Sequence, residues 1–402
     1  MSDTVATTGR GTGSTSRREH LWQVDLLRIL PMVMVVGVHT AIFTQPAQSG
    51  GANGVVFFLH VSRFLFFFIT AFVLFYSYGG RSTSVRAFWR KRFPPIVVPY
   101  LAWTLIYWQL NRVFPWSDHP ASLMGSLTDL ATNLAQGWFH LYFLVVTMQF
   151  YLLFPLVSWF VRRTEGRHWQ LLGVSALIEL IWTGFFQYGW HLMPAVVQLA
   201  SAKAQVELPS YEFFFVVGAL AAIHRHELMG WIRRHRPIAV AGSLAAVVLS
   251  GCVYLLNLLL GEAPASADQV FQPATLLLFL GSVLGLWLLA DALLRTHATD
   301  GWLWRRIHGA ADLSFGIYLS HMVALQFVDL ARVHGVLGLN DLSGLALGVD
   351  CWAMAVLGAV LIAAAVCYSP LSWVLTGRPR RRLSPGWWHR ARPIGPAMSD
   401  GT

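Results

Sequence analysis

Long apolar stretches alternate with short polar ones along almost the whole chain. Ten of them approach or exceed the roughly 20 residues that a helix needs to cross a bilayer. They lie near 21–44, 55–79, 94–114, 138–161, 169–190, 210–228, 237–260, 272–294, 310–332 and 346–375. This pattern predicts an all-α fold, a polytopic bundle of about ten transmembrane helices. The longest gap, near 115–137, is expected to be only a loop.

Basic residues concentrate in every second connection between the apolar stretches. If the N-terminus lies inside, the cytoplasmic segments carry 24 of the 29 Lys and Arg residues, and the outer connections carry almost none. Such asymmetry orients membrane proteins with their basic loops inside. We therefore expect both termini to be cytoplasmic, in a multi-pass protein of the inner cell membrane.

The two ends of the chain differ in composition from the part between them. Residues 1–20 are rich in Gly, Ser and Thr, which predicts a disordered cytoplasmic tail. The apolar run that follows has no small-residue cleavage site and is too long for a signal sequence, so it is expected to be retained as a helix. Residues 21–376 then form one transmembrane domain, and 377–402 form a basic cytoplasmic tail.

Composition supports a membrane environment and narrows the possible partners. The 402 residues are 55% hydrophobic with a mean hydropathy of +0.54, and only 12% are charged, against about 25% in soluble domains. The net charge of +10 resides in the short basic connections, so a lipid bilayer is the expected partner and nucleic acid is not. Three cysteines inside apolar runs give neither a disulfide framework nor a metal-ligand pattern, and no metal site is expected.

The first apolar stretch contains three ionisable residues, which are expensive in a membrane. In a helix, Arg28 lies about 20° from His39 and Asp25 about 40° from it in the other direction, so all three share one face. His39 would lie about 16 Å deeper than Arg28. One interpretation is structural, with an Asp25–Arg28 pair and a hydrogen-bonded His39; the other is a polar path that leads to a catalytic imidazole.

Histidine is well suited to proton transfer near neutral pH. In acyl transfer, a neutral His39 can deprotonate an acceptor hydroxyl. It can instead take the acyl group itself. The residues alone leave both open, with Asp25 as its catalytic companion.

Further polar residues in the apolar stretches are candidates for substrate binding. Tyr318 and His321 fall on one face of the ninth stretch, with Ser314 one turn before them. Arg63 in the second stretch needs a partner inside lipid, and His140 opens the fourth. Structural packing of these polar groups is the alternative interpretation.

The densest internal run of charge is Arg86, Arg90, Lys91 and Arg92. Its simplest interpretation is anchoring against anionic lipid. A functional interpretation is a docking site for the phosphates of a nucleotide-like donor such as coenzyme A, since arginine forks match phosphate geometry. There is no GxGxxG and no Walker motif, so dinucleotide redox and ATP chemistry lack support.

Several segments resemble the acyltransferase-three family of integral-membrane acyltransferases. Arg28, ten residues and His39 match the family's first-helix pattern, and 66–75 is similar to its Phe-Phe-x-x-Ser-Gly-Phe second helix. Residues 87–100, 140–155, 212–218 and 314–321 look like later family segments. A family Arg-x-x-Arg motif is missing, because Arg92 is followed by Phe-Pro-Pro.

The resemblance implies transfer of an acyl group, commonly acetyl from cytoplasmic acyl-CoA, to a hydroxyl of a glycan or other acceptor at the outer face. His39 would be the essential catalytic residue, and Arg28, Arg86, Arg90 and Arg92 would serve the donor. Acyl-CoA would be a substrate, with no permanently bound cofactor. The sequence is expected to be a stand-alone form without a fused extracytoplasmic domain.

Two other functions compete with the enzyme. An exporter of a glycan or small molecule would also need a polar path, but matching Gly- or Pro-broken helices in two halves are not found. A structural scaffold would leave the shared face of Asp25, Arg28 and His39 without a purpose. Acceptor identity, acyl length and oligomeric state do not follow from the residues.

Overall fold

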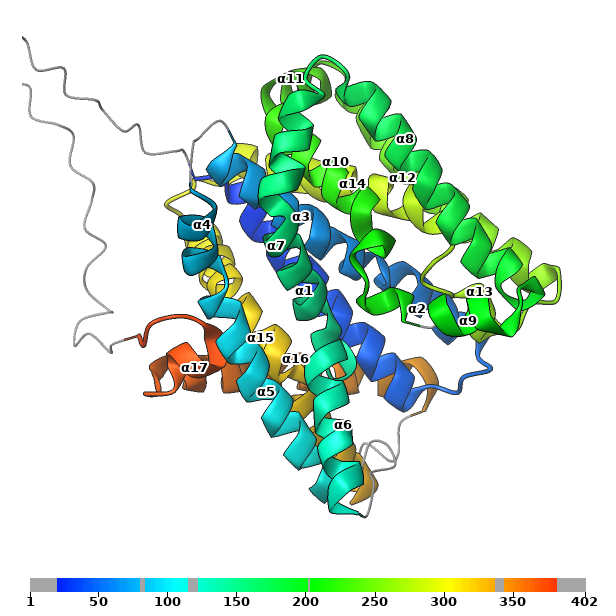
Figure 1. Ribbon diagram of the computed structural model, residues 1–402, viewed down its shortest axis with the longest axis vertical. Coiled ribbons are helices and arrows are strands. Elements are labelled where there is room, and N and C mark those ends of the chain that lie inside the picture. The colour runs from blue at the N-terminus through cyan, green and yellow to red at the C-terminus, as the bar shows by residue number, and fades with distance from the viewer. Residues whose placement is uncertain (1–19, 80–83, 115–121, 202, 337–342, 382–402) are drawn as a thin grey trace, which may run out of the picture.

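The computed structural model describes residues 20–79, 84–114, 122–201, 203–336 and 343–381. The predicted tails, 1–20 and 377–402, lie almost wholly outside these ranges. In the described residues the chain is a bundle of helices, and no strand occurs (Figure 1). The predicted fold class, a polytopic all-α bundle, is therefore confirmed.

The described residues of the first half of the chain form nine α-helices and three short helical turns. They are α1 (Trp22–Thr44), α2 (Gly50–Leu59), α3 (Val61–Tyr78), α4 (Val85–Arg92), α5 (Pro94–Val113), α6 (Leu123–Gln136), η1 (Phe139–Leu141), α7 (Tyr142–Arg163), α8 (His168–Gly184), η2 (Phe185–Gly189), η3 (Trp190–Leu192) and α9 (Ala195–Ser201). The second half contains η4 (Ala204–Val206), η5 (Leu208–Tyr211), α10 (Glu212–Ile223), α11 (Arg225–Arg234), α12 (Arg236–Leu259), α13 (Pro264–Ala267), α14 (Ala274–Thr296), α15 (Trp302–Val333), α16 (Gly344–Tyr368) and α17 (Ser372–Thr376).

Each of the ten predicted apolar stretches is helical. Within the described residues, eight helical segments are long and apolar enough to cross a membrane. The other two predicted stretches are α5 and the shorter α10, which has only 12 residues. Many large apolar side chains on the outside, such as Leu156 at 60% exposure and Leu244 at 61%, fit a surface that faces lipid.

The expectation of a mere loop near 115–137 was wrong. Residues 123–136 form α6, whose start is capped by the Ser122 hydroxyl accepting from the Gly125 amide at 3.1 Å. Alternating polar residues on one side of α6 lower its mean hydropathy, so an apolar-run criterion overlooks it. The helix packs on α5 and α7 and leads directly into a turn that carries His140.

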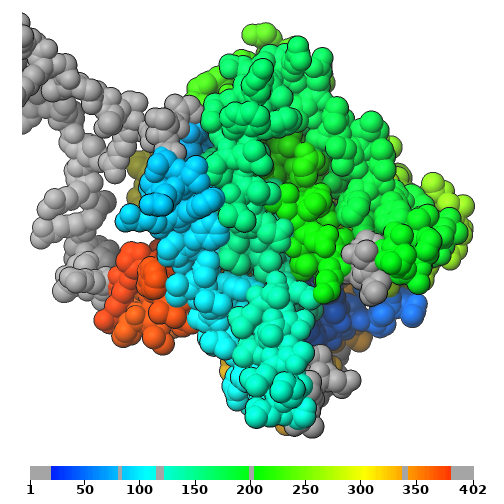
Figure 2. All heavy atoms as spheres, viewed as in Figure 1, coloured from blue at the N-terminus to red at the C-terminus, as the bar shows by residue number. Residues whose placement is uncertain are grey.

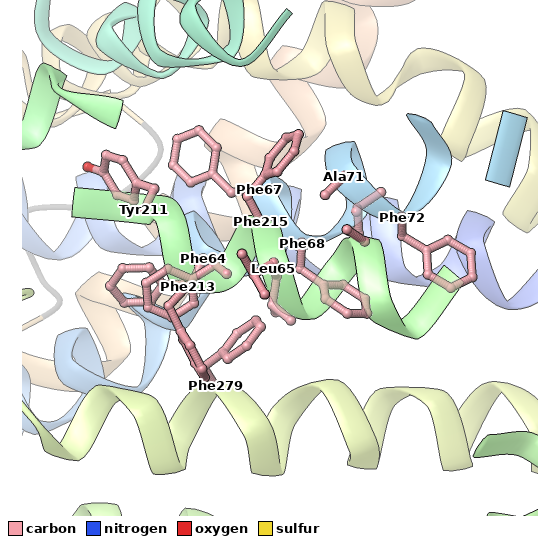
Figure 3. Packing of buried hydrophobic residues seen from close by; sticks show 14 of the residues in the cluster. Phe64, Leu65, Phe67, Phe68, Ala71, Phe72, Tyr211, Phe213, Phe215 and Phe279 are labelled. Atoms are coloured by element: carbon pink, nitrogen blue, oxygen red, sulfur yellow. The ribbon is translucent and has the colours of Figure 1, made fainter. Parts of the chain in front are cut away.

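The core forms around α3 and α10, which approach each other very closely. Phe64 of α3 stacks on Phe214 of α10 with ring centroids 4.0 Å apart, and Phe68 of α3 packs on Phe279 of α14 at 5.9 Å (Figure 3). A Cβ at Gly218 would lie 2.3 Å from the Phe68 carbonyl oxygen, so only glycine allows this approach. The aromatic cluster fixes α3 and, with it, the residues at the start of α3.

The first helix is central to the bundle. It packs on α3, α15 and α16, so its polar residues are enclosed by other helices rather than by lipid. Figure 1 shows α4 and α11 at the end of the bundle where α1 begins, with α6, α9 and α13 toward the end where α1 finishes. On the outside, α17 lies against α5 (Figure 2), where the Trp103 indole donates to the Leu375 carbonyl at 2.9 Å.

Candidate active site

Three histidines from three separate segments gather near the C-terminal end of α1. The rings of His39 on α1 and His321 on α15 are stacked with centroids 5.2 Å apart. His140 on η1 lies 4.5 Å from His321 and 6.2 Å from His39, centroid to centroid. Among the described residues, His140 and His321 are buried and His39 is partly buried.

The turn after α6 places His140 in this cluster. Gly137 has φ +82°, and a Cβ there would lie 2.3 Å from the Tyr142 amide nitrogen, so a glycine is required. Phe139 adopts φ +43°, a left-handed conformation that costs about 1–2 kcal/mol for a residue with a Cβ. Its ring packs against His39 at 4.8 Å. Strain of this kind often marks functional sites.

The imidazoles are poor in hydrogen-bond partners for such a buried position. Nδ1 of His39 and Nε2 of His321 are buried with no hydrogen-bond partner in the described part of the chain, whereas the His140 ring lies against the backbone of Tyr318 and Leu319. His321 Nδ1 donates to the Tyr318 carbonyl at 2.6 Å, so in the neutral ring Nε2 keeps its lone pair. Buried polar atoms normally find partners, and these nitrogens are therefore available to a substrate.

A cavity of about 40 Å³ adjoins the cluster. Its wall is made by Val35, Val38, His39, His60, Ser62, Arg63, Phe66, His140, Tyr142, Phe143 and Tyr318. The structure thus brings four predicted residues, His39, Arg63, His140 and Tyr318, to one small space. The fifth, His321, lies directly behind His39.

A break between α2 and α3 sets the polar side of the cavity. His60 separates the two helices, and its Nδ1 contacts the Asp268 carbonyl oxygen at 3.1 Å. The Arg63 guanidinium carbon lies 5.1 Å from the centroid of the Tyr142 ring. No salt bridge holds Arg63 within the described residues; the face of Tyr142 and a hydrogen bond with the Tyr211 hydroxyl stabilise its charge.

Residues of the site that sequence reasoning left without a role are His60 and Tyr142. His60 was visible as a histidine in an apolar stretch, but its contact with the backbone of Asp268 spans 208 residues. Tyr142 follows His140 by two positions, and only the tertiary contact with Arg63 marks it.

The predicted face of Asp25, Arg28 and His39 is not a single site. Fourteen residues of helix separate Asp25 from His39, a rise of about 21 Å. Asp25 does not reach the imidazole cluster; its Oδ2 atom lies 2.8 Å from His20 Nε2 and 2.8 Å from His308 Nδ1. Arg28 lies near this end too, in electrostatic contact with Asp25, Asp312 and Arg378.

The predicted donor arginines on α4 lie on the surface. Arg86 and Arg90 are exposed, whereas Arg92 donates to the Tyr78 hydroxyl at 3.2 Å and covers its ring. None of the three lines the large cavity at this end of the bundle.

That cavity of about 1410 Å³ opens beside the start of α1. His20 and Trp22 form part of its wall. Its basic residues are Arg162, Arg225, Arg233 and Arg295, which come from α7, α11 and α14. Arg295 is paired with Asp291 at 2.8 Å, whereas the other three arginines form no salt bridge among the described residues, and Glu165 lies in the same wall.

The fold and the site together define a multi-pass membrane protein with a buried imidazole centre and a large basic cavity at one end. The model of the acyltransferase-three family, described as an acyltransferase domain, matches residues 21–376. The chain belongs to this family of membrane acyltransferases. Comparison with curated proteins and with solved structures gives no match.

Proposed function

We propose that the protein moves an acetyl group from cytoplasmic acyl-CoA to a hydroxyl of a glycan or another acceptor at the outer side of the inner cell membrane. Family membership supports acyl transfer in a membrane. The observation that carries the rest is the placement of His39, His140 and Arg63 around one small cavity, with His321 stacked on His39.

The position of His39 along α1 supports a two-sided reaction. Seventeen residues, or about 26 Å of rise, separate it from the start of the helix at Trp22, and five residues, or about 8 Å, from the end at Thr44. The large basic cavity adjoins the start of α1. With the predicted orientation, a nucleotide would bind on the cytoplasmic side while its long arm carries the acyl group toward the outer side.

The chemistry assigned to the site is attack of an acceptor hydroxyl on a thioester. His39 takes the proton of the hydroxyl as its oxygen bonds to the carbonyl carbon. The bond from carbon to sulfur then breaks, and the leaving thiolate takes the proton from the imidazolium. Arg63, at the same cavity, stabilises the negative charge that develops on the carbonyl oxygen.

His140, His321 and Tyr318 position the reacting imidazole. His321 stacks on His39, and the Tyr318 hydroxyl donates to the His140 carbonyl, which ties α15 to η1. Asp25 is too far along α1 to touch the reacting atoms, and we assign it a positioning role at the other end of the helix.

Two groups of arginines are proposed to bind the donor. Arg162, Arg225 and Arg233 meet its phosphates first, because these three arginines line one large cavity that is open to the outside. Arg28, Arg86, Arg90 and Arg92 form a second basic group at the same end of the bundle and draw the anionic donor toward it.

The size of the inner cavity favours a short acyl group. A volume of about 40 Å³ leaves room for a small group only, and Phe66, Tyr142 and Phe143 make part of its wall. An acetyl group is the smallest acyl group that coenzyme A commonly carries, whereas each further methylene would press on Phe66 or Phe143.

The test supplies radiolabelled acetyl-CoA to inside-out membrane vesicles and follows the label into extracted glycan and lipid. Wild type and His334→Ala, an exposed-histidine control, are expected to transfer label, and His39→Ala is expected to lose at least about 100-fold. Equal transfer by His39→Ala would remove the catalytic role. Export of unlabelled glycan without transfer from any donor would favour the rival exporter.

A second measurement separates the two possible roles of His39. Protein incubated with labelled donor and no acceptor is quenched in acid and in base. If His39 only moves a proton, no label stays on the protein. Label that is retained by wild type and absent from His39→Ala would instead indicate an acyl-imidazole intermediate.

A further inference from the structure

We infer that His20, Asp25 and His308 form a binding site for a divalent transition-metal ion, with zinc as the best match, which pins the start of α1 to α15. The three residues come from the segment before α1, the first turn of α1 and the second turn of α15. Their ligand atoms, two imidazole nitrogens and a carboxylate oxygen, all lie within 4.8 Å of one another. This inference does not rest on the proposed acyl transfer.

The donor set fits this class of ion. Both imidazole nitrogens lie 2.8 Å from the same atom, Asp25 Oδ2. Two imidazoles and one carboxylate, with a fourth position open to water, are a common ligand set for zinc. Harder ions such as magnesium prefer oxygen ligands, so imidazole nitrogens select against them.

The outer partners of His308 strengthen the assignment. Its second nitrogen, Nε2, lies 4.0 Å from Asp312 Oδ2, one turn further along α15. Asp312 is itself held by Arg378 at 2.7 Å and Arg381 at 3.2 Å. A carboxylate behind a ligating imidazole is the usual way to orient the ring and raise its basicity.

Burial around the cluster leaves an approach for the ion. The Asp25 side chain is only 3% exposed, whereas those of His20 and His308 are 46% and 47% exposed. The carboxylate is thus fixed inside the protein, while both imidazoles are partly exposed and His20 also lines the large cavity. Trp22 packs edge-on against both rings, at 4.6 Å and 5.9 Å between centroids, and restricts their rotation.

The position of this site in the bundle gives it a structural role. From Asp25 to His39 is fourteen residues of α1, and from His308 to His321 is thirteen residues of α15, so the rises are about 21 and about 20 Å. The two helices are therefore held in register at two levels. The metal ion would hold their N-terminal turns, and the stacked imidazoles lie near the end of α1 and in the middle of α15.

The test uses purified full-length protein without a polyhistidine tag, stripped with a chelator and titrated with Co²⁺. We expect about one equivalent to bind with the visible absorption of a four-coordinate site, and Zn²⁺ to displace it. His20→Ala and His308→Ala should each weaken binding more than 10-fold. His226→Ala, a histidine on the same cavity but outside the cluster, should bind like wild type.

Two results would overturn the site. One is the absence of near-stoichiometric binding by the wild-type protein; the other is equal binding by wild type, His20→Ala and His308→Ala. His308→Cys guards against a folding defect, because a thiolate ligand should restore binding and add a sulfur-to-cobalt charge-transfer band in the near ultraviolet. Binding by His308→Cys without that band would also contradict the assignment.

Discussion

Single residues determine how the imidazole rings of the cluster are oriented toward a substrate. His321 shows this most clearly, because its Nδ1 is committed to the Tyr318 carbonyl and its Nε2 faces the cluster without a partner in the described residues. A ring fixed in this way fixes the ring that stacks on it, His39. Loss of His321 should therefore disturb orientation rather than donor binding.

We expect His321→Ala to lower kcat for acetyl transfer about 10- to 100-fold with little change in KM for the donor, because misplacement of a catalytic group mainly affects the chemical step. Steady-state assays with labelled acetyl-CoA measure both constants. His334→Ala, at the residue that follows the end of the same helix, should match wild type. An unchanged kcat would show that the stacking has no role.

Phe66 is the second residue with a separable effect, since it forms part of the wall of the inner cavity. Phe66→Leu should enlarge the cavity and raise the rate with propionyl- or butyryl-CoA relative to acetyl-CoA several-fold, because one methylene is worth about 1–3 kcal/mol in a tight pocket. Phe150→Leu, in the core but outside the cavity wall, is the control. The same change in preference in both variants would exclude a role for Phe66 in selecting the acyl group.

Most residues around the inner cavity could be predicted from the sequence, but which of them lie together in space could not. Helical phase placed Asp25, Arg28 and His39 on one face, which is correct for an isolated helix, but depth along the helix separates them into two sites. Asp25 pairs with His308 across 283 residues, and no local pattern contains that contact. Arg63 was recognisable because a charge in an apolar stretch demands an explanation, while Tyr142 beside it was not.

At the scale of helices, close approach between α3 and α10 is the feature most sensitive to substitution. Gly218→Ala would place a methyl group 2.3 Å from the Phe68 carbonyl oxygen, so the helices must separate. Overpacking of this kind costs about 1–3 kcal/mol. We expect a lower midpoint of thermal unfolding in detergent, together with reduced transfer activity.

The matched control for that substitution is Gly242→Ala on α12. Nothing lies within 4 Å of a Cβ at Gly242, and the position is on the outside of the bundle. Replacing a helical glycine there should leave stability unchanged or raise it by up to about 1 kcal/mol. Equal destabilisation by both variants would mean that the helix contact at Gly218 is not what limits stability.

Another prediction at this scale concerns the connection between α12 and α14. Burial raises the pKa of the Asp268 carboxyl to about 7 from an ordinary 3.8. Between pH 3.8 and about 7, the carboxyl is protonated in the folded protein and ionised in the unfolded chain. The free energy of unfolding therefore falls as pH rises through this range, and the destabilisation is complete above pH 7.

Asp268→Asn removes the ionisable group and should stabilise the protein at pH 8 by about 1–2 kcal/mol, a figure reduced for partial solvent screening. The gain should shrink toward pH 4.5, where the wild-type carboxyl is protonated. Thermal unfolding of both proteins across this range measures the difference. A gain that does not depend on pH would point to packing instead of ionisation.

Helices were the part of the structure most accessible from sequence. Apolar length alone located all ten stretches because lipid forces backbone groups to pair within each segment. The apolar-length criterion overlooked α6, which leads into the turn that carries His140, and it could not show that His60 interrupts the second span. Both departures contribute to the cavity, at η1 and at the start of α3.

On the scale of the whole molecule, the two cavities lie at opposite ends of α1, and donor binding should be separable from chemistry. Replacing Arg162 and Arg225 together with Gln removes two charges from the large cavity. We expect KM for acetyl-CoA to rise at least several-fold, with kcat nearly unchanged, because the lost contacts lie far from the reacting atoms.

Arg163→Gln is the control, since Arg163 is exposed beside Arg162 but does not line the cavity. A parallel double variant, Arg86→Gln with Arg90→Gln, measures the contribution of α4.

If only the α4 variant raises KM, the phosphates bind on the surface and the large cavity serves another purpose. If the cavity variant raises KM and the effect weakens at high salt, the donor enters there, because screened charge is what attracts it. The arm of the donor then has to span the rise of about 26 Å between Trp22 and His39, so the donor must lie along α1 to reach the imidazole.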